Sequence, residues 1–526
     1  MKRLVRCALA AMFVFGALAA PASAAHQDFL NMSLEFSDPK EDNITSDIAF
    51  WGDTAFVGNY DGLRTYDISD PDDPVRLTQP EFECYGPQND PSVWDTDGNG
   101  EADLLVLSVD RTLTGPQCGA EDAPHAGPGW EGIRLFDVSD PANPEYLKDV
   151  YLDCGSHTNT LYPDPVRNND SDPDNDRLIV LISSYPLRPG PTCGPHAAPA
   201  RDPHHGVIQT VFIPLEGNAE TSGLAAEEGP ELPINYPGDP DNTFRPSEHG
   251  LTGPDILDGL RACHDIAVYL PQNLVAGACA EQSQLWRIDE TTGLPDTSDP
   301  IWVFDQRNID FHHSATFTWD GEVVNIIDES FGSGCPTVTQ GIGQTGRMFF
   351  VDTDTGARLS QFMISRSHKR ETPDYCSAHL GNVVPASDKY LLVNAWYTGG
   401  VDVIDFSNPR APKEVAFYDV NGDEWSGYWY EQDGTSASGP LNVFGTHGVE
   451  HVAHGEGEEA EARGFESFLA DVAASRGTLD HLNPQVQEEA FAASPQASRS
   501  ARKARAAREK NRGKVSRKRV LEHLGP

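Results

Sequence analysis

The chain has few basic residues for its length. Lys and Arg number 38 in 526 residues against 81 Asp and Glu, so the formal net charge is −43. This deficit of positive charge disfavours nucleic acid and anionic lipid as partners of the main body of the protein. The exception is the C-terminus, where residues 499–519 contain eleven Lys or Arg and one Glu. We expect this basic tail, 499–526, to be disordered or to contact an anionic cell envelope.

Long apolar runs are absent beyond the N-terminus. No run after residue 24 reaches the length of a membrane span, which excludes a transmembrane helix in that part of the sequence. Residues 1–24 begin with Lys2 and Arg3, continue with a short apolar run, and end in Ala22-Ser23-Ala24. This pattern predicts a cleaved signal peptide and therefore a secreted, extracellular protein.

Compact catalytic motifs are also absent. The sequence contains no nucleophile elbow, no phosphate-binding glycine loop and no dinucleotide fingerprint. These absences leave two hypotheses open. The first is a non-catalytic extracellular module, expected to be monomeric, that binds a protein or a glycan. The alternative is a metal-dependent extracellular enzyme, an oxidase or hydrolase.

Three segments of the chain repeat one pattern. They read GLRTYDISDPDDPVRL from Gly62, GIRLFDVSDPANPEYL from Gly132 and GVDVIDFSNPRAPKEV from Gly400. Each is an alternating strand that ends in Asp, a turn bracketed by two prolines, and a second strand. A unit this small cannot bury its own apolar face, so several units must pack side by side.

The strand signals predict an all-β fold. Six four-stranded units follow one another, and a seventh lacks one strand, which FLNMSLEF at residues 29–36 can supply to close the ring. We therefore expect a seven-bladed β-propeller over residues 25–448, with an insertion at about 216–260. An acidic, partly helical extension is expected over 449–498.

The repeated segments resemble the LVIVD-repeat family. The resemblance covers roughly residues 44–445 and is strongest in the first, second and sixth units. It implies an exported bacterial or archaeal protein with a propeller fold. It implies no catalytic residue, because the family is mostly without an assigned activity.

The cysteines predict disulfides. Excluding Cys7 in the signal peptide, eight remain, an even number in an exported chain. One cysteine of each expected pair precedes the first strand of a unit, and the other follows a second strand. This register predicts the pairs Cys84–Cys118, Cys154–Cys193, Cys263–Cys279 and Cys335–Cys376.

One acidic loop is a candidate calcium site. Asp95, Asp97, Asn99 and Asp103 alternate around two glycines just before a strand. Oxygen ligands spaced in this way on a bent loop suit a hard cation such as calcium. The alternative interpretation is an ordinary turn held by Asp and Asn side chains.

Five histidines are a second candidate, for a transition metal. They lie at the entrance of a unit's first strand, which in a propeller lines the central channel: His157, His264, His312, His313 and His379. Converging neutral imidazoles bind zinc, copper or iron, and Asp265, Asp328 and Glu329 are acidic companions that can orient or complete such a site. The alternative is structural, with each histidine hydrogen-bonded to the backbone of a neighbouring unit.

Overall fold

The computed structural model describes most of the chain between residues 29 and 488. The described ranges are 29–32, 36–38, 43–86, 88–110, 117–118, 132–152, 154–184, 206–215, 217–235, 262–306, 308–330, 335, 346–365, 376–386, 389–419, 424–431, 443–447 and 477–488. Their helical content is one short helix, α1 (Ala219–Leu224), and two 3-10 turns, η1 (Pro173–Asn175) and η4 (Leu270–Gln272). No helix in these ranges is long and apolar enough to cross a membrane.

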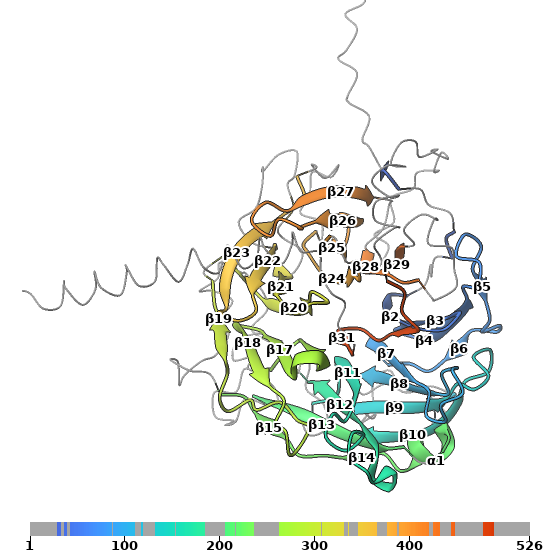
Figure 1. Ribbon diagram of the computed structural model, residues 1–526. Helices are drawn as coiled ribbons and strands as arrows, with labels where there is room; N and C mark the ends of the chain where they lie inside the picture. The colour runs from blue at the N-terminus through green and yellow to red at the C-terminus, as the bar shows by residue number, and fades with distance from the viewer. Residues whose placement is uncertain are drawn as a thin grey trace, which may run out of the picture.

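Strands are the main regular structure of the described residues, and they are mostly antiparallel and arranged in consecutive units that surround a common centre (Figure 1). The first two units are β2 (Thr45–Trp51), β3 (Thr54–Asn59), β4 (Gly62–Asp67), β5 (Val75–Arg76) and β6 (Phe82–Glu83), then β7 (Gln88–Trp94), β8 (Leu104–Val109), β9 (Gly132–Asp137) and β10 (Glu145–Tyr151). The third is β11 (Thr158–Pro163), β12 (Arg177–Ser183), β13 (Val207–Pro214), β14 (Glu227–Glu228) and β15 (Leu232–Pro233). The outer strands of this third unit, β14 and β15, come from the expected insertion.

The next three units repeat the same order. They are β16 (Asp265–Tyr269), β17 (Leu274–Cys279), β18 (Gln282–Arg287) and β19 (Trp302–Phe304); β20 (His312–Phe317), β21 (Val323–Asp328), β22 (Met348–Asp352) and β23 (Ala357–Phe362); and β24 (Leu380–Val384), β25 (Leu391–Ala395), β26 (Val401–Asp405) and β27 (Lys413–Tyr418). A seventh unit is described by two strands, β28 (Glu424–Trp429) and β29 (Val443–His447).

The first strands of the units form a closed ring. Contacts run from β2 to β7, β11, β16, β20, β24 and β28, and β28 returns to β2. This is the arrangement of a β-propeller, and the apolar core lies between neighbouring sheets. Since β28 and β29 are the described strands of the last unit, seven complete four-stranded blades stay a prediction.

The repeated sequence has a specific structural role. Asp67, Asp137 and Asp405 end their strands, and each accepts a hydrogen bond of 2.9 Å from the backbone N–H two residues later, which holds the turn. The glycine that opens the strand is required by close packing, because a Cβ on Gly400 would lie 2.0 Å from the carbonyl oxygen of Tyr418.

The expected role of the N-terminal strand is wrong. β1 (Phe29–Leu30) pairs antiparallel with β27, the outer strand of the sixth unit, and not with the last unit. It therefore lengthens a sheet that already has four strands. The alternating sequence of residues 29–36 specifies a strand but not which exposed sheet edge it joins.

Residues 477–488 cross the ring at one end. They contain β30 (His481–Leu482), which pairs with Phe50 and Trp51 at the end of β2, and β31 (Val486–Gln487), which pairs with the end of β16. In Figure 1, β31 lies near the centre of the ring. The described part of the expected partly helical extension is therefore extended; the remainder of 449–498 and the tail 499–526 lie outside the described residues.

Three of the expected cysteine pairs are disulfides in the structure: Cys84–Cys118, Cys263–Cys279 and Cys335–Cys376. Cys193 lies outside the described residues, so its pairing with Cys154 stays a prediction. Cys263 directly precedes His264 and Cys376 lies three residues before His379. Disulfides therefore restrain the chain where it enters the first strands.

Candidate metal centre

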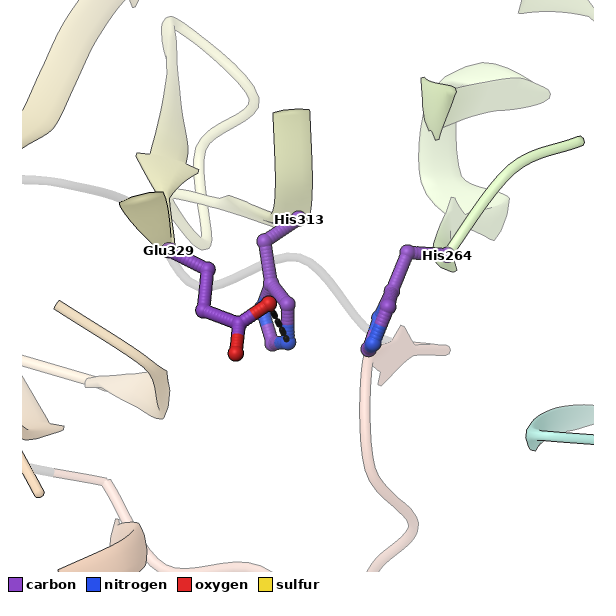
Figure 2. Close-up of side chains that lie close together, drawn as sticks. All are labelled: His264, His313 and Glu329. Carbon is purple, nitrogen blue, oxygen red and sulfur yellow. Dashed lines mark ion pairs between the residues drawn. The ribbon is translucent and has the colours of Figure 1, made fainter. Parts of the chain in front are cut away.

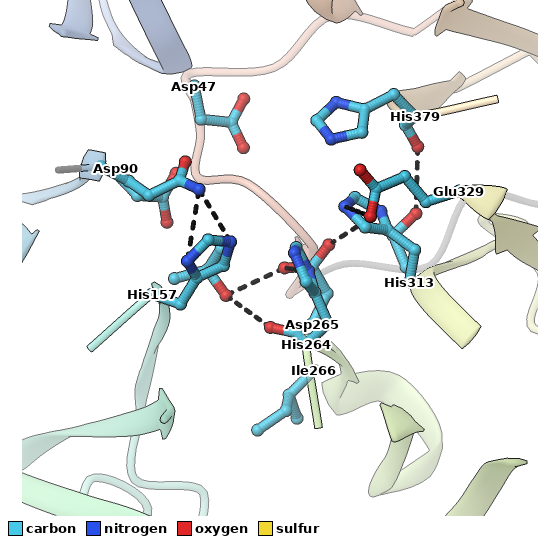
Figure 3. Close-up of polar contacts among 12 residues, drawn as sticks. Asp47, Asp90, His157, His264, Asp265, Ile266, His313, Glu329 and His379 are labelled. Carbon is cyan, nitrogen blue, oxygen red and sulfur yellow. Dashed lines mark hydrogen bonds and ion pairs between the residues drawn. The ribbon is translucent and has the colours of Figure 1, made fainter. Parts of the chain in front are cut away.

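Four of the five candidate histidines meet at the centre of the ring. The rings of His157, His264, His313 and His379 form a row, with centroids 4.4, 3.7 and 4.3 Å apart. All four are buried, and Figure 3 shows them approaching one region from separate strands. They meet because every first strand runs in the same direction, so residues at the strand starts gather at one end of the ring.

His312 does not join this group. His312 pairs with Asp328 and Ser314 with Ile327, so His313 is the extra residue of a β-bulge, which directs its side chain separately from that of His312. The Nδ1 atom of His312 lies 2.8 Å from the Ser283 hydroxyl oxygen, and its ring packs 6.2 Å from that of Phe304. It is a buried residue between strands, and the expectation that it contributes to a metal site is not supported by its position.

His264, His313 and Glu329 form the candidate metal-binding triad. One ligand atom from each lies within 4.8 Å of the others, and among the described residues no other set of three His, Cys, Asp or Glu side chains does so. Figure 2 shows the three side chains facing one another. His313 Nε2 and Glu329 Oε2 are 3.9 Å apart, too long for a hydrogen bond and close to the separation of two ligands that each bind one ion at about 2.0–2.2 Å.

His313 gives the strongest indication that this group binds something. It is fully buried, and neither ring nitrogen has a hydrogen-bond partner. A buried polar atom without a partner costs roughly 1–3 kcal/mol, so native proteins rarely leave one. A metal ion bound to a ring nitrogen would offset this cost.

The two outer histidines are held by other contacts. His157 Nδ1 lies 2.9 Å from Asp110 Oδ2 and its Nε2 lies 2.7 Å from Gln88 Nε2. His379 Nδ1 donates to the backbone carbonyl oxygen of Trp425 in the next unit. The structural interpretation, a hydrogen bond to the backbone of a neighbouring unit, therefore describes His379, whereas His157 is held by side chains instead. The metal interpretation fits His264 and His313.

Glu329 is oriented by a tyrosine. The hydroxyl of Tyr397 donates a 2.7 Å hydrogen bond to Glu329 Oε1, which leaves Oε2 for an ion. Tyr397 has φ of 51°, a left-handed conformation that is rare for a bulky side chain. Such strain costs about 1–3 kcal/mol and concentrates at functional sites.

Burial keeps the candidate ligands in forms suited to a metal. It lowers the pKa of His264 and His313 well below the ordinary value, reinforced by the neighbouring histidines, and lowers that of His379 to about 4. These imidazoles are therefore neutral at pH 7 and protons do not compete for them. Burial also raises the pKa of Glu329 to about 7, so an arriving cation would readily displace its proton.

Asp328 does not face the histidines. Its Oδ1 accepts hydrogen bonds from the backbone N–H groups of Asp310, Phe311 and Ser330, and its Oδ2 accepts one from Gly346. It thereby joins the chain just before His313 to the chain just after Glu329. Of the three expected acidic companions, Glu329 is in the triad, Asp265 lies beside it, and Asp328 supports it from behind.

The candidate calcium loop is explained by its own hydrogen bonds. Asp95 accepts three backbone N–H bonds at 2.7–3.2 Å, and Asp97 and Asn99 each accept one. Asp103 turns inward and accepts from the backbone and hydroxyl of Thr96. The carboxylates of this loop do not converge as the triad does, so calcium binding there stays a prediction.

Several residues at the centre carry no recognisable sequence signal. Gln88 occupies in the second unit the place that histidine takes in others, and nothing in its sequence context distinguishes it. Tyr397 lies two residues after the second strand of the sixth unit and reaches Glu329 only through the fold. Asp47 and Asp90 are buried on β2 and β7, where a sequence pattern predicts apolar or small residues.

Comparison with known proteins supports the assignment of the repeat but assigns no ligand or reaction to this chain. Residues 383–420, which span most of the sixth unit, match the LVIVD repeat, a β-propeller repeat. No curated protein matches the chain.

Similar solved structures include a protein from Lactobacillus plantarum, at 11% identity over 78% of this chain and 97% of that chain, with a TM-score of 0.40. Sqt1 of Saccharomyces cerevisiae has 10% identity over 80% of this chain and 100% of its own, with a TM-score of 0.42. A chain of the Mitotic Checkpoint Complex has 10% identity over 81% and 92%, with a TM-score of 0.38. TM-scores this low support no functional comparison with any of the three.

Proposed function

We propose that this protein is an exported β-propeller that binds a transition-metal ion at its centre through His264, His313 and Glu329. The single observation that carries the proposal is His313, which is fully buried with both ring nitrogens unpartnered between a second histidine and a carboxylate. Two imidazoles and one carboxylate are the ligand set of catalytic zinc sites, which leave the fourth position open. Copper and iron accept the same donors, so the donor set alone does not choose among the three.

The geometry also favours a catalytic metal site, and therefore a metal-dependent enzyme, over a site that holds a purely structural ion. A structural zinc site is closed by four protein ligands, whereas here the neighbouring His157 and His379 are engaged by Asp110, Gln88 and Trp425. An ion with an open position polarises a bound water or substrate oxygen. Export is supported by the predicted signal peptide and by the disulfides.

Metal analysis of protein purified without a histidine tag tests this proposal. We expect about one equivalent of zinc, copper or iron, and a loss of most of it in His313→Ala and Glu329→Gln. His312→Ala is the matched control, because it removes the adjacent buried imidazole, which faces away from the centre. Folded wild-type protein that binds no transition metal, or equal losses in His312→Ala and His313→Ala, would refute the proposal.

A protein- or glycan-binding module is the second candidate. The observation that favours it is a pair of half-buried aromatic rings, Tyr60 and Trp425, 6.2 Å apart, with Trp425 also 4.8 Å from His379. Aromatic rings that are partly accessible to solvent are common anchors at binding surfaces. A glycan array gives the test: retention of wild-type protein that Trp425→Ala loses while its metal content is unchanged would favour the binding module.

A further inference from the structure

Three buried aspartates form a second group at the centre, beside the histidines. Asp47 lies on β2, Asp90 on β7 and Asp265 at the start of β16, and they are 1%, 1% and 0% exposed. Figure 3 shows Asp47 and Asp90 on the side of His157, and Asp265 next to His264. Three of the ring's first strands therefore direct a carboxyl group into one dry region.

Two of these carboxyl groups have an oxygen with no hydrogen-bond partner. Asp90 Oδ2 accepts from the backbone N–H of Asn159, but Oδ1 is buried and unpartnered. Asp265 Oδ1 accepts from the Thr158 hydroxyl, and its Oδ2 is likewise buried and unpartnered.

The third carboxyl group is positioned from both sides. Asp47 Oδ1 accepts from the backbone N–H of Ile48, and Oδ2 accepts a 2.9 Å bond from the hydroxyl of Tyr428, on the inner strand of the last unit. Asp47 is thus held toward the other two aspartates and has little freedom to turn to solvent.

In the described part of the chain, no Lys or Arg side chain neutralises these three carboxyl groups. Neither Asp47 nor Asp90 forms an ion pair with Lys or Arg, and Asp265 has only histidines near it. His313 Nδ1 lies 3.8 Å from Asp265 Oδ2 and forms no hydrogen bond with it. An uncompensated buried carboxylate is costly, so the group must take up a proton or a cation.

We propose that Asp47, Asp90 and Asp265 bind a second cation, a hard divalent ion of the calcium, magnesium or manganese class. Carboxylate oxygens are the ligands these ions prefer, whereas the triad beside them offers imidazole. Among the described residues only the triad has three ligand atoms that all lie within 4.8 Å of one another, so the three carboxylates as a set are more widely spaced. Since like charges repel, a cation would draw the free oxygens together.

Protonation is the competing way to neutralise the group. Burial raises the pKa of Asp47 to about 7 and that of Asp90 well above its ordinary value, with mutual repulsion adding to both. A shared proton would remove part of the charge but would not use the unpartnered oxygens of both Asp90 and Asp265. The two alternatives give different results when a cation is offered.

Titration with manganese, followed by electron paramagnetic resonance, distinguishes cation binding from protonation, because bound and free Mn²⁺ give different signals. Wild-type protein is expected to bind one Mn²⁺ in this group, and Asp90→Asn to weaken its binding at least tenfold. Glu329→Gln should retain that Mn²⁺, since it disrupts only the triad. Asp402→Asn, a buried aspartate on β26 away from the centre, controls for the loss of a buried charge.

Absence of Mn²⁺ binding by the wild type, or binding unchanged in Asp90→Asn, would overturn the second site and indicate protonation. If Asp90→Asn does not fold, Asp47→Asn replaces it under the same expectation. Loss of Mn²⁺ in Glu329→Gln but not in the aspartate variants would assign the ion to the triad, and so would also overturn the second site. The test does not depend on zinc, copper or iron binding, so this inference and the proposed function can fail separately.

Discussion

At the residue scale, the centre of the ring combines groups whose burial makes them sensitive to pH. His379 shows the effect clearly, because burial lowers its pKa to about 4 from an ordinary 6.5. The unfolded chain therefore binds a proton between pH 6.5 and 4 that the folded protein excludes. Stability from this residue is complete above pH 6.5 and is lost as the pH falls toward 4.

The variant His379→Gln isolates this contribution. Relative to it, wild-type protein should lose about 3 kcal/mol of unfolding free energy between pH 7 and pH 4, following about 1.4 kcal/mol per pKa unit. Comparing the two proteins cancels the opposite trend from Glu329 and Asp47, whose raised pKa values favour the folded state at lower pH. Urea unfolding of the metal-free proteins at several pH values provides the measurement, and parallel curves would contradict the assignment.

At the element scale, His313 lies at the start of β20 and Glu329 directly follows β21, and Asp328 holds these two neighbouring chain segments together. Its carboxylate accepts hydrogen bonds from four backbone N–H groups, and these groups would lose their partner if the carboxylate were removed. Asp328→Ala should therefore lower the unfolding free energy by about 2–4 kcal/mol. It should also weaken metal binding about 10–100-fold, as loss of a supporting contact does in metal sites.

The control for this prediction is Asp352→Ala. Asp352 is buried at the end of the next strand, where it accepts from the backbone and hydroxyl of Thr355. It pairs with Val323, at the opposite end of β21 from Glu329. The Asp352→Ala variant should be less stable than the wild type but should bind the metal with unchanged affinity. Calorimetric metal titration of both variants measures this difference, and an equal loss of affinity in the two would assign Asp328 a general structural role.

Elements also show how far sequence reasoning reaches. The Asp and Gly positions of the repeat, the three cysteine pairs and the convergence of four histidines follow from local pattern and strand register. His312 differs from the expectation because a β-bulge at His313 separates the directions of the two adjacent histidines, and the sequence does not indicate that bulge. The pairing partners of β1, β30 and β31 depend on which sheet edges and strand ends remain unpaired once the ring has formed. A strand of two residues is too short for a periodic pattern that would predict its partner.

At the scale of the whole molecule, residues 477–488 bind together units that are far apart in the sequence. The backbone N–H of Gly52 donates to the carbonyl of Asp480, and the Gln487 amide donates to the carbonyl of Phe317 in the fifth unit. The backbone N–H of Gly477 donates to the carbonyl of Pro385, just after the first strand of the sixth unit. All these contacts lie where the first strands end, whereas the histidines lie where those strands begin. The segment thus ties the ring together at the end opposite the metal centre.

Asn483 is the residue through which this segment can be tested. Its side-chain amide accepts from the N–H of Val93 at 2.7 Å and donates to the carbonyl of Val93 at 2.8 Å, and both residues are buried. Asn483→Ala leaves these two backbone groups unpaired, so we expect a loss of about 2–4 kcal/mol in unfolding free energy. Asn143→Ala, in an exposed turn where the amide donates only to Asp140, should change stability by less than about 0.5 kcal/mol.

The position of the segment adds a second requirement to this prediction. Because Val93 lies near the end of β7 and the triad lies at the strand starts, Asn483→Ala should reduce stability without changing the stoichiometry or affinity of metal binding. Thermal unfolding and calorimetric titration on the same sample measure the two quantities. Loss of metal together with stability would mean that the two ends of the ring are energetically coupled, so that a segment closing one end also sets the geometry of the other.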